Sequence, residues 1–266
     1  MDDASQAQYT HGHPESVLRS HRWRTVENSA AYVLPHLRAG AAVLDVGSGP
    51  GTITADIASR VAPGEVVGID VSDDVVDAAA ADHAAPNLSF RRGDVRDMSP
   101  FAGRFDVVHA HQVLQHLGDP VGALVEMKRA CRSGGVVAAR DADYAAMTWW
   151  PDVPGLHRWL EVYRTVARAN GGEPDAGRRL VGWAAAAGFE DIDATASAWC
   201  FAGEDRAWWA GTWAERISAS PLASRAVELG VASRSELGAC ADAWREWAAA
   251  DDASFLVVHG EIIVRA

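Results

Sequence analysis

Three glycines stand within five residues at Gly47-Ser48-Gly49-Pro50-Gly51. A short apolar run, Ala41 to Val46, precedes them, and the apolar residues of Thr52 to Val61 recur at helical spacing. A strand, a glycine turn and a helix in this order let the backbone pass close to a ligand at the strand's carboxyl end. This feature favours a fold built around a parallel α/β sheet.

The rest of the chain repeats the alternation of strand and helix. Runs rich in β-branched residues indicate further strands, and 3.6-residue spacing indicates the helices between them. The expected later strands are 65–70, 88–91, 105–110, 136–139, one within 189–201, and 255–264, with helices at 75–83, 120–131 and 176–187. We therefore predict an α/β fold with a doubly wound, mostly parallel sheet of seven strands.

Composition limits the partners. The chain carries 24 Lys and Arg against 36 Asp and Glu, a net charge of −12, so its average field repels a phosphate backbone and disfavours nucleic acid. Its three dispersed cysteines form no CxxC pair, which favours a reducing, cytoplasmic location. No stretch approaches roughly 18 continuous apolar residues, so we expect no membrane insertion. These properties favour a small-molecule partner.

The glycine turn alone fits more than one cofactor. Dinucleotide sites carry GxGxxG, whose glycines make room for a pyrophosphate at a helix N-terminus. Here the spacing is GxGxG, and Asp45 lies two residues before the first glycine. Asp70 ends the next expected strand, where an acid can accept both hydroxyls of a ribose. Gly93-Asp94-Val95 follows the third strand, and no Tyr-x-x-x-Lys pair supports a nicotinamide-dependent reductase.

These motifs, in this order, resemble those of the class I S-adenosylmethionine-dependent methyltransferases over roughly Ala41 to Ala139. Residues 114–120 and 132–135 are similar to the ubiquinone/menaquinone-biosynthesis branch of that family. The resemblance implies a Rossmann-like fold, S-adenosyl-L-methionine as cofactor and S-adenosyl-L-homocysteine as product. The cofactor-binding residues that it implies are Asp45, Gly47 and Gly49 at the turn, Asp70 at the ribose with Val71 beside it, Asp94 and Val95 at the adenine, and His111.

The resemblance implies a role for the N-terminal segment, and the helix and strand patterns divide the remaining chain. An N-terminal helical segment, 1–40, is expected to close over the cofactor, with Tyr9 and Arg24 sealing it and the arginine fork meeting the methionine carboxylate. The other expected units are the core 41–147, a helical insertion 148–173, a core helix and strand 174–203, a helical lid 204–254 and the last strand 255–266.

Methyl transfer from a sulfonium is an in-line substitution, so the protein aligns the acceptor and, for a hydroxyl or an acidic carbon, removes its proton. The candidate bases come from the loops after the fourth and fifth strands: His111, His116, Asp141, Asp143 and Tyr144. We rank His111 and Asp143 first as catalytic residues. The HxH pairs at 11–13 and 109–111 lack a third ligand, so we expect no metal.

Eleven tryptophans are many for 266 residues. Trp159, Trp183, Trp244 and Trp247 lie on apolar helical faces and are expected in the core, while Trp149, Trp150, Trp208, Trp209 and Trp213 are expected to line a pocket.

The leading hypothesis is an enzyme that methylates oxygen or carbon of a small apolar or aromatic metabolite, in secondary or quinone-type metabolism. The alternative is a protein that binds the cofactor without methyl transfer, as a sulfonium-assisted cyclase or binding partner. A homodimer is left open.

Overall fold

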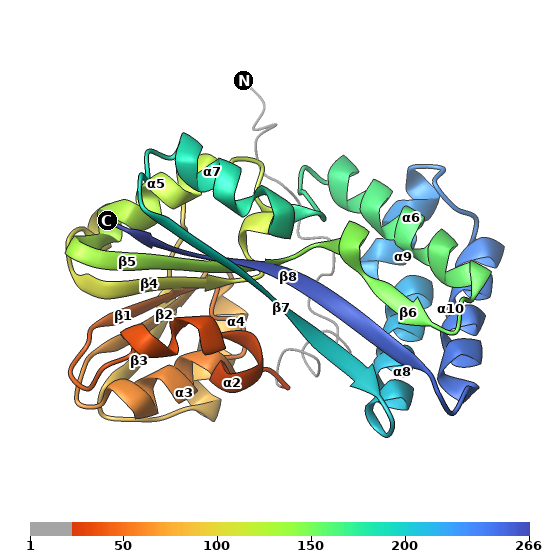
Figure 1. Ribbon diagram of the computed structural model, residues 1–266, viewed down its shortest axis with the longest axis horizontal. Coiled ribbons are helices and arrows are strands. Elements are labelled where there is room, and N and C mark those ends of the chain that lie inside the picture. The colour runs from red at the N-terminus through yellow and green to blue at the C-terminus, as the bar shows by residue number, and fades with distance from the viewer. Residues whose placement is uncertain (1–22) are drawn as a thin grey trace.

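Eight strands form one sheet in the computed structural model, which describes residues 23–266 (Figure 1). The strands are β1 (Val43–Val46), β2 (Val66–Asp70), β3 (Leu88–Arg92), β4 (Phe105–His111), β5 (Cys131–Ala142), β6 (Thr148–Trp150), β7 (Ile192–Ala202) and β8 (Ser254–Arg265). The first five lie parallel in the order β3-β2-β1-β4-β5, and β8 runs antiparallel to β5, β6 and β7. The predicted fold class is therefore confirmed.

The strand count differs from the prediction of seven. The additional strand, β6, lies at the start of the expected helical insertion 148–173 and pairs Trp149 with Phe255 of β8. Aromatic residues favour strands when a pairing edge is present, and β8 supplies that edge from more than 100 residues away along the chain, at 254–256. The helix of the insertion begins only at Pro154.

The helices cover both faces of the sheet and form a lobe at one end. They are α2 (Val26–Ser29), α3 (Thr52–Val61), α4 (Asp73–Asp82), α5 (Pro120–Ala130), α6 (Pro154–Ala169), α7 (Leu180–Ala186), α8 (Asp205–Ala219), α9 (Pro221–Glu228) and α10 (Arg234–Ala249), with a 3₁₀ turn at Ala31–His36. Ser72 and Ser233 cap α4 and α10 through their hydroxyls, and Pro221 sits in the first turn of α9. No helix within 23–266 is long and apolar enough to cross a membrane.

Alternate residues of the central strands feed two separate cores. On one face, Val43 and Val107 pack with residues of α2 and α3. On the other, Leu44 and Val108 pack with residues of α5 and α7. This two-sided burial explains why the strands read as nearly continuous apolar runs. It also fixes the carboxyl ends of β1, β2, β4 and β5 along one edge of the sheet.

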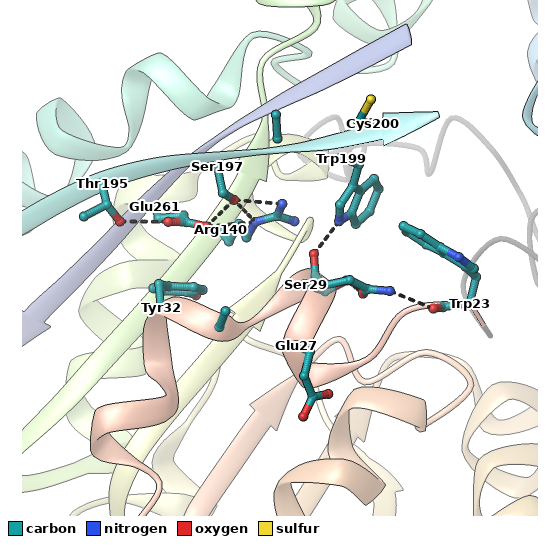
Figure 2. Close-up of a pocket in the computed structure, with 13 residues that line it drawn as sticks. Trp23, Glu27, Ser29, Tyr32, Arg140, Thr195, Ser197, Trp199, Cys200 and Glu261 are labelled. Carbon is teal, nitrogen blue, oxygen red and sulfur yellow. Dashed lines mark hydrogen bonds and ion pairs between the residues drawn. The ribbon is translucent and has the colours of Figure 1, made fainter. Parts of the chain in front are cut away.

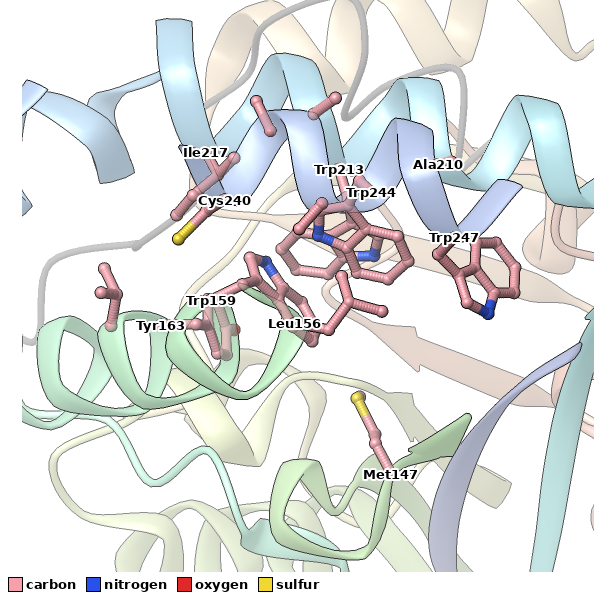
Figure 3. Close-up of a cluster of buried hydrophobic side chains, with 14 of the residues drawn as sticks. Met147, Leu156, Trp159, Tyr163, Ala210, Trp213, Ile217, Cys240, Trp244 and Trp247 are labelled. Atoms are coloured by element: carbon pink, nitrogen blue, oxygen red, sulfur yellow. The ribbon is translucent and has the colours of Figure 1, made fainter. Parts of the chain in front are cut away.

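The helical lobe begins where β7 and β8 run past the carboxyl end of β5, and α6, α8 and α10 pack there around a third core (Figure 3). Trp159, Trp244 and Trp247 are fully buried, as predicted. Trp209 and Trp213 are buried as well, so the prediction that they line a pocket is wrong. The core formed by these helices and the ends of β7 and β8 is large enough to bury both tryptophans. Trp209 stacks on Phe201 there, with ring centroids 3.9 Å apart.

Candidate active site

The glycine turn after β1 adopts a backbone that other residues rarely reach. Gly47, Gly49 and Gly51 all have positive φ, at 66°, 53° and 83°. A Cβ at Gly47 would lie 2.5 Å from Cγ2 of Val113, which follows β4. The turn therefore leaves bare backbone at the carboxyl edge of the sheet, with room beside it only for a glycine.

Asp45 supports this turn from below. Its side chain is buried, Oδ2 accepts a hydrogen bond from Thr54 Oγ1 at 2.5 Å, and Oδ1 lies 2.8 Å from His109 Nδ1. These bonds tie the end of β1 to α3 and to β4. The structure thus places Asp45 where it shapes the turn, with its carboxylate already held by two protein partners.

Asp70 and Val71 stand next to the turn at the end of β2. Asp70 Oδ2 accepts from Gly49 N at 3.2 Å, and Oδ1 accepts from Ser72 N at 3.1 Å. A carboxylate has about four acceptor positions, so both oxygens keep capacity for further donors such as ribose hydroxyls. Val71 is 61% exposed, an open apolar surface beside that carboxylate. The pair suits a ribose and its attached ring.

The predicted adenine motif is only partly open to a ligand. The guanidinium of Arg96 donates to both oxygens of Asp94, at 2.5 to 3.0 Å, and this lowers the pKa of the carboxyl. An adenine amino group would share Asp94 with that arginine. Val95 is buried in the core beneath α5, so its backbone rather than its side chain is available to border a ring.

His111 is the last residue of β4 and lies at the same edge. Its ring is buried beside Trp199 and His259, with centroid distances of 5.7 and 6.2 Å, and neither ring nitrogen has a hydrogen-bond partner among residues 23–266. Burial, followed by the positive charges of Arg24 and Arg140, holds its pKa well below the usual range. The imidazole is therefore neutral near pH 7, and the same burial and positive charges oppose its protonation.

Arg24 lies at the His111 end of the site. Its Nη2 donates to Gln112 Oε1 at 2.8 Å, and its guanidinium sits 5.5 Å from the centroid of Trp199. Gln112 has a φ of 54°, unusual for a residue other than glycine, and its amide nitrogen lies 2.8 Å from His259 Nε2. This bridge joins the N-terminal segment to β4 and β8. Tyr9, the other predicted sealing residue, lies outside the described residues.

Asp143 is held differently from His111. Its carboxylate accepts from Arg178 Nε and Nη2 at 2.6 and 2.7 Å, and from the backbone of Ala146 at 3.2 Å. The side chain is buried, and it joins the end of β5 to the segment before α7. The structure gives Asp143 a structural position, and of our two ranked bases only His111 is left with unpaired ring atoms.

The buried carboxyl of Asp141 should make the stability of the folded protein depend on pH. The carboxyl is fully buried, accepts from Gln115 N at 3.1 Å, and burial raises its pKa to about 7. Its unfolded pKa is about 3.9, so protonation favours the folded state and this contribution is lost as pH rises through 7. We expect Asp141→Asn to be more stable than wild type at pH 8, with a smaller difference at pH 5, in urea titrations. A pH-independent difference would contradict this.

Sequence analysis missed a buried ion pair between β5 and β8. Arg140 is 1% exposed, and its Nε donates to Glu261 Oε1 at 3.1 Å. Ser197 and Thr195 of β7 donate to the two oxygens of Glu261, at 2.5 and 2.7 Å. The available signal was a charged residue, Arg140 or Glu261, next to the apolar run of each strand. Among residues 23–266, no cluster of three or more potential ligand side chains could hold a metal ion.

The chain is similar in sequence to known methyltransferases. A family model described as a methyltransferase domain matches residues 37–180, more than half of the chain. An uncharacterized methyltransferase of Schizosaccharomyces pombe is 34% identical, over 98% of this chain and 97% of its own length. A trans-aconitate 2-methyltransferase of Deinococcus radiodurans is 33% identical over 45% of this chain and 46% of its own length.

The fold agrees as well. The structure of phosphoethanolamine N-methyltransferase 2 from Haemonchus contortus, solved with phosphomonomethylethanolamine and S-adenosylhomocysteine, has a TM-score of 0.56 at 16% identity and covers 94% of this chain and 57% of that chain. The bare turn at Gly47, the carboxylate of Asp70 and the open surface of Val71 fit S-adenosylmethionine as the cofactor. Family model, full-length relative and site geometry together show that the chain belongs to the class I S-adenosylmethionine-dependent methyltransferases.

Proposed function

We propose that this methyltransferase acts on an oxygen or carbon atom of a small, largely apolar or aromatic metabolite, and that His111 receives the proton that the acceptor loses. The observation that carries the proposal is the position of His111: its ring is buried beside Trp199 and His259 and has no hydrogen-bond partner among residues 23–266. A buried, unpaired imidazole at the carboxyl edge suits proton transfer with a bound acceptor.

The chain's own residues divide the work. The cofactor, when bound, supplies a methyl group on a sulfonium. The turn at Gly47 and the carboxylate of Asp70 would hold it at the ends of β1 and β2. The aromatic surroundings of His111 exclude water and orient an apolar acceptor. The relative named for trans-aconitate acts on a small molecule, which supports an acceptor of this size.

We expect His111→Gln to lower kcat by about 100-fold, the usual size of a general-base contribution, while S-adenosylhomocysteine binding is retained. The measurement is transfer of a labelled methyl group to an acceptor, alongside calorimetric binding of the product cofactor. His157→Gln is the matched control, because His157 is an exposed histidine of α6 paired with Asp152. A His111→Gln enzyme with the wild-type kcat would remove His111 from the chemistry.

A further inference from the structure

A groove of about 610 Å³ opens on the sheet face next to His111, between α2 and β7 (Figure 2). Trp23 and Trp199 form one wall, the ring of Tyr32 forms part of the other, and Arg140 and Glu261 lie at the floor. Register places Arg140 directly opposite His111 across β4 and β5. His111 does not itself line the groove, but its ring lies 5.7 Å from that of Trp199, which does.

The floor of the groove has an unused hydrogen-bond donor on a buried cation. Glu261 accepts from three donors, Arg140 Nε and Ser197 at Oε1 and Thr195 at Oε2. Arg140 donates from Nε to Glu261 and Ser197, and from Nη2 to Ser197. Its buried Nη1 has no acceptor among residues 23–266. A buried polar atom without a partner is uncommon and calls for a ligand or water. Nη1 of Arg140 therefore lacks an acceptor. A carboxylate oxygen of a ligand could accept from it.

The wall of the groove is aromatic and has two arginines beside it, while the carboxylates of Glu27 and Glu261 also line the groove. Trp199 packs edge-on against Trp23 with centroids 5.3 Å apart, and its Nε1 donates to Asn28 O at 2.5 Å, which fixes the ring. Arg140 and Arg24 lie 5.0 and 5.5 Å from the Trp199 centroid. Burial first, and then these two charges, lower the pKa of both His111 and His259. An anion carrying a flat ring suits the aromatic wall and the two arginines.

We propose that this groove binds the methyl acceptor and that the acceptor is a planar aromatic carboxylate, its ring against Trp199 and its carboxylate on Arg140. The assignment rests on the proposed function, since it names the acceptor class for the site at His111. Arg140 anchors the acid group by charge-assisted hydrogen bonding, which leaves another atom of the acceptor to face His111.

The test compares two probes of the same shape, 4-fluorobenzoate and 4-fluorobenzamide, by fluorine NMR titration of the protein saturated with S-adenosylhomocysteine. We expect the wild type to bind the carboxylate at least about tenfold more tightly than the amide. In the double variant Arg140→Gln/Glu261→Gln, which removes both charges together, this preference should fall to about one. Trp199→Leu should weaken both probes about tenfold and keep the preference.

The control is the double variant Arg104→Gln/Glu65→Gln, which removes an ion pair that is 39% and 50% exposed in its side chains and should keep the wild-type preference. A carboxylate preference that survives in Arg140→Gln/Glu261→Gln would overturn the proposal, as would equal binding of the two probes by the wild type. The carboxylate must also inhibit methyl transfer; binding without inhibition would overturn the acceptor assignment. Because these readouts compare binding, they are separate from the kcat test of His111.

Discussion

Gly47→Ala is expected to weaken S-adenosylhomocysteine binding by at least about 100-fold, or about 2.7 kcal/mol. Two costs combine at this position. An alanine must adopt a φ of 66°, which costs about 1 kcal/mol or more for an L-residue. Its Cβ would also lie 2.5 Å from Cγ2 of Val113, so Val113 must move. The branched side chain of Val113 has few rotamers available for that movement. Both costs fall on the turn that we expect to hold the cofactor, and calorimetry measures the loss of binding.

Gly182→Ala provides the matched control, since Gly182 lies within α7 and a Cβ there would meet nothing within 4 Å. That variant should bind the product cofactor like wild type and gain roughly 0.5–1 kcal/mol of stability from helix propensity. Wild-type cofactor affinity in Gly47→Ala would mean that the turn does not hold the cofactor.

Glu261→Gln is expected to destabilise the protein by about 3 kcal/mol, because it leaves the charge of Arg140 buried without a counter-charge. Burial lowers the pKa of Arg140 to about 10, so the guanidinium still carries its proton at pH 7. The double variant Arg140→Gln/Glu261→Gln should recover most of that loss, since no charge is left in the interior. Urea unfolding of the single and double variants measures both quantities.

Glu65→Gln is the control for this prediction, because its partner Arg104 lies in water-exposed surroundings and such pairs contribute about 0 to 1 kcal/mol. If Glu261→Gln unfolded at the same urea concentration as Glu65→Gln, the interior pair would be no more costly to break than a surface one. That result would contradict the buried arrangement of β5 and β8.

The elements that sequence analysis predicted depend on short-range signals. The turn at Gly47 and the acid at Asp70 follow directly from strand, turn and helix patterns within about thirty residues, and the structure places them side by side. Local pattern was therefore enough for the fold class, and it also indicated that Asp70 lies beside the glycine turn, where Gly49 N donates to it.

The features that it missed depend on distant pairing. Arg140 and Glu261 are 121 residues apart, and only the register of β5 against β8 brings them together. Trp149 became part of a strand because β8 extends beyond β5. Asp143 reads as an accessible acid after a strand, but Arg178, 35 residues later, occupies its carboxylate. A sequence pattern shows where a charged residue lies along the chain, but it does not show which residue that charge pairs with in the fold.

The central claim is that the methyl group reaches a small acceptor seated beside His111. The most direct measurement incubates the enzyme with cofactor labelled in its methyl group and a mixture of aromatic acids, and follows the label and S-adenosylhomocysteine together by mass spectrometry. We expect one labelled methyl group on an aromatic acid for each S-adenosylhomocysteine released, with both signals greatly reduced in Gly47→Ala. An acid converted without label, or S-adenosylhomocysteine released with no label on any acid, would contradict the claim.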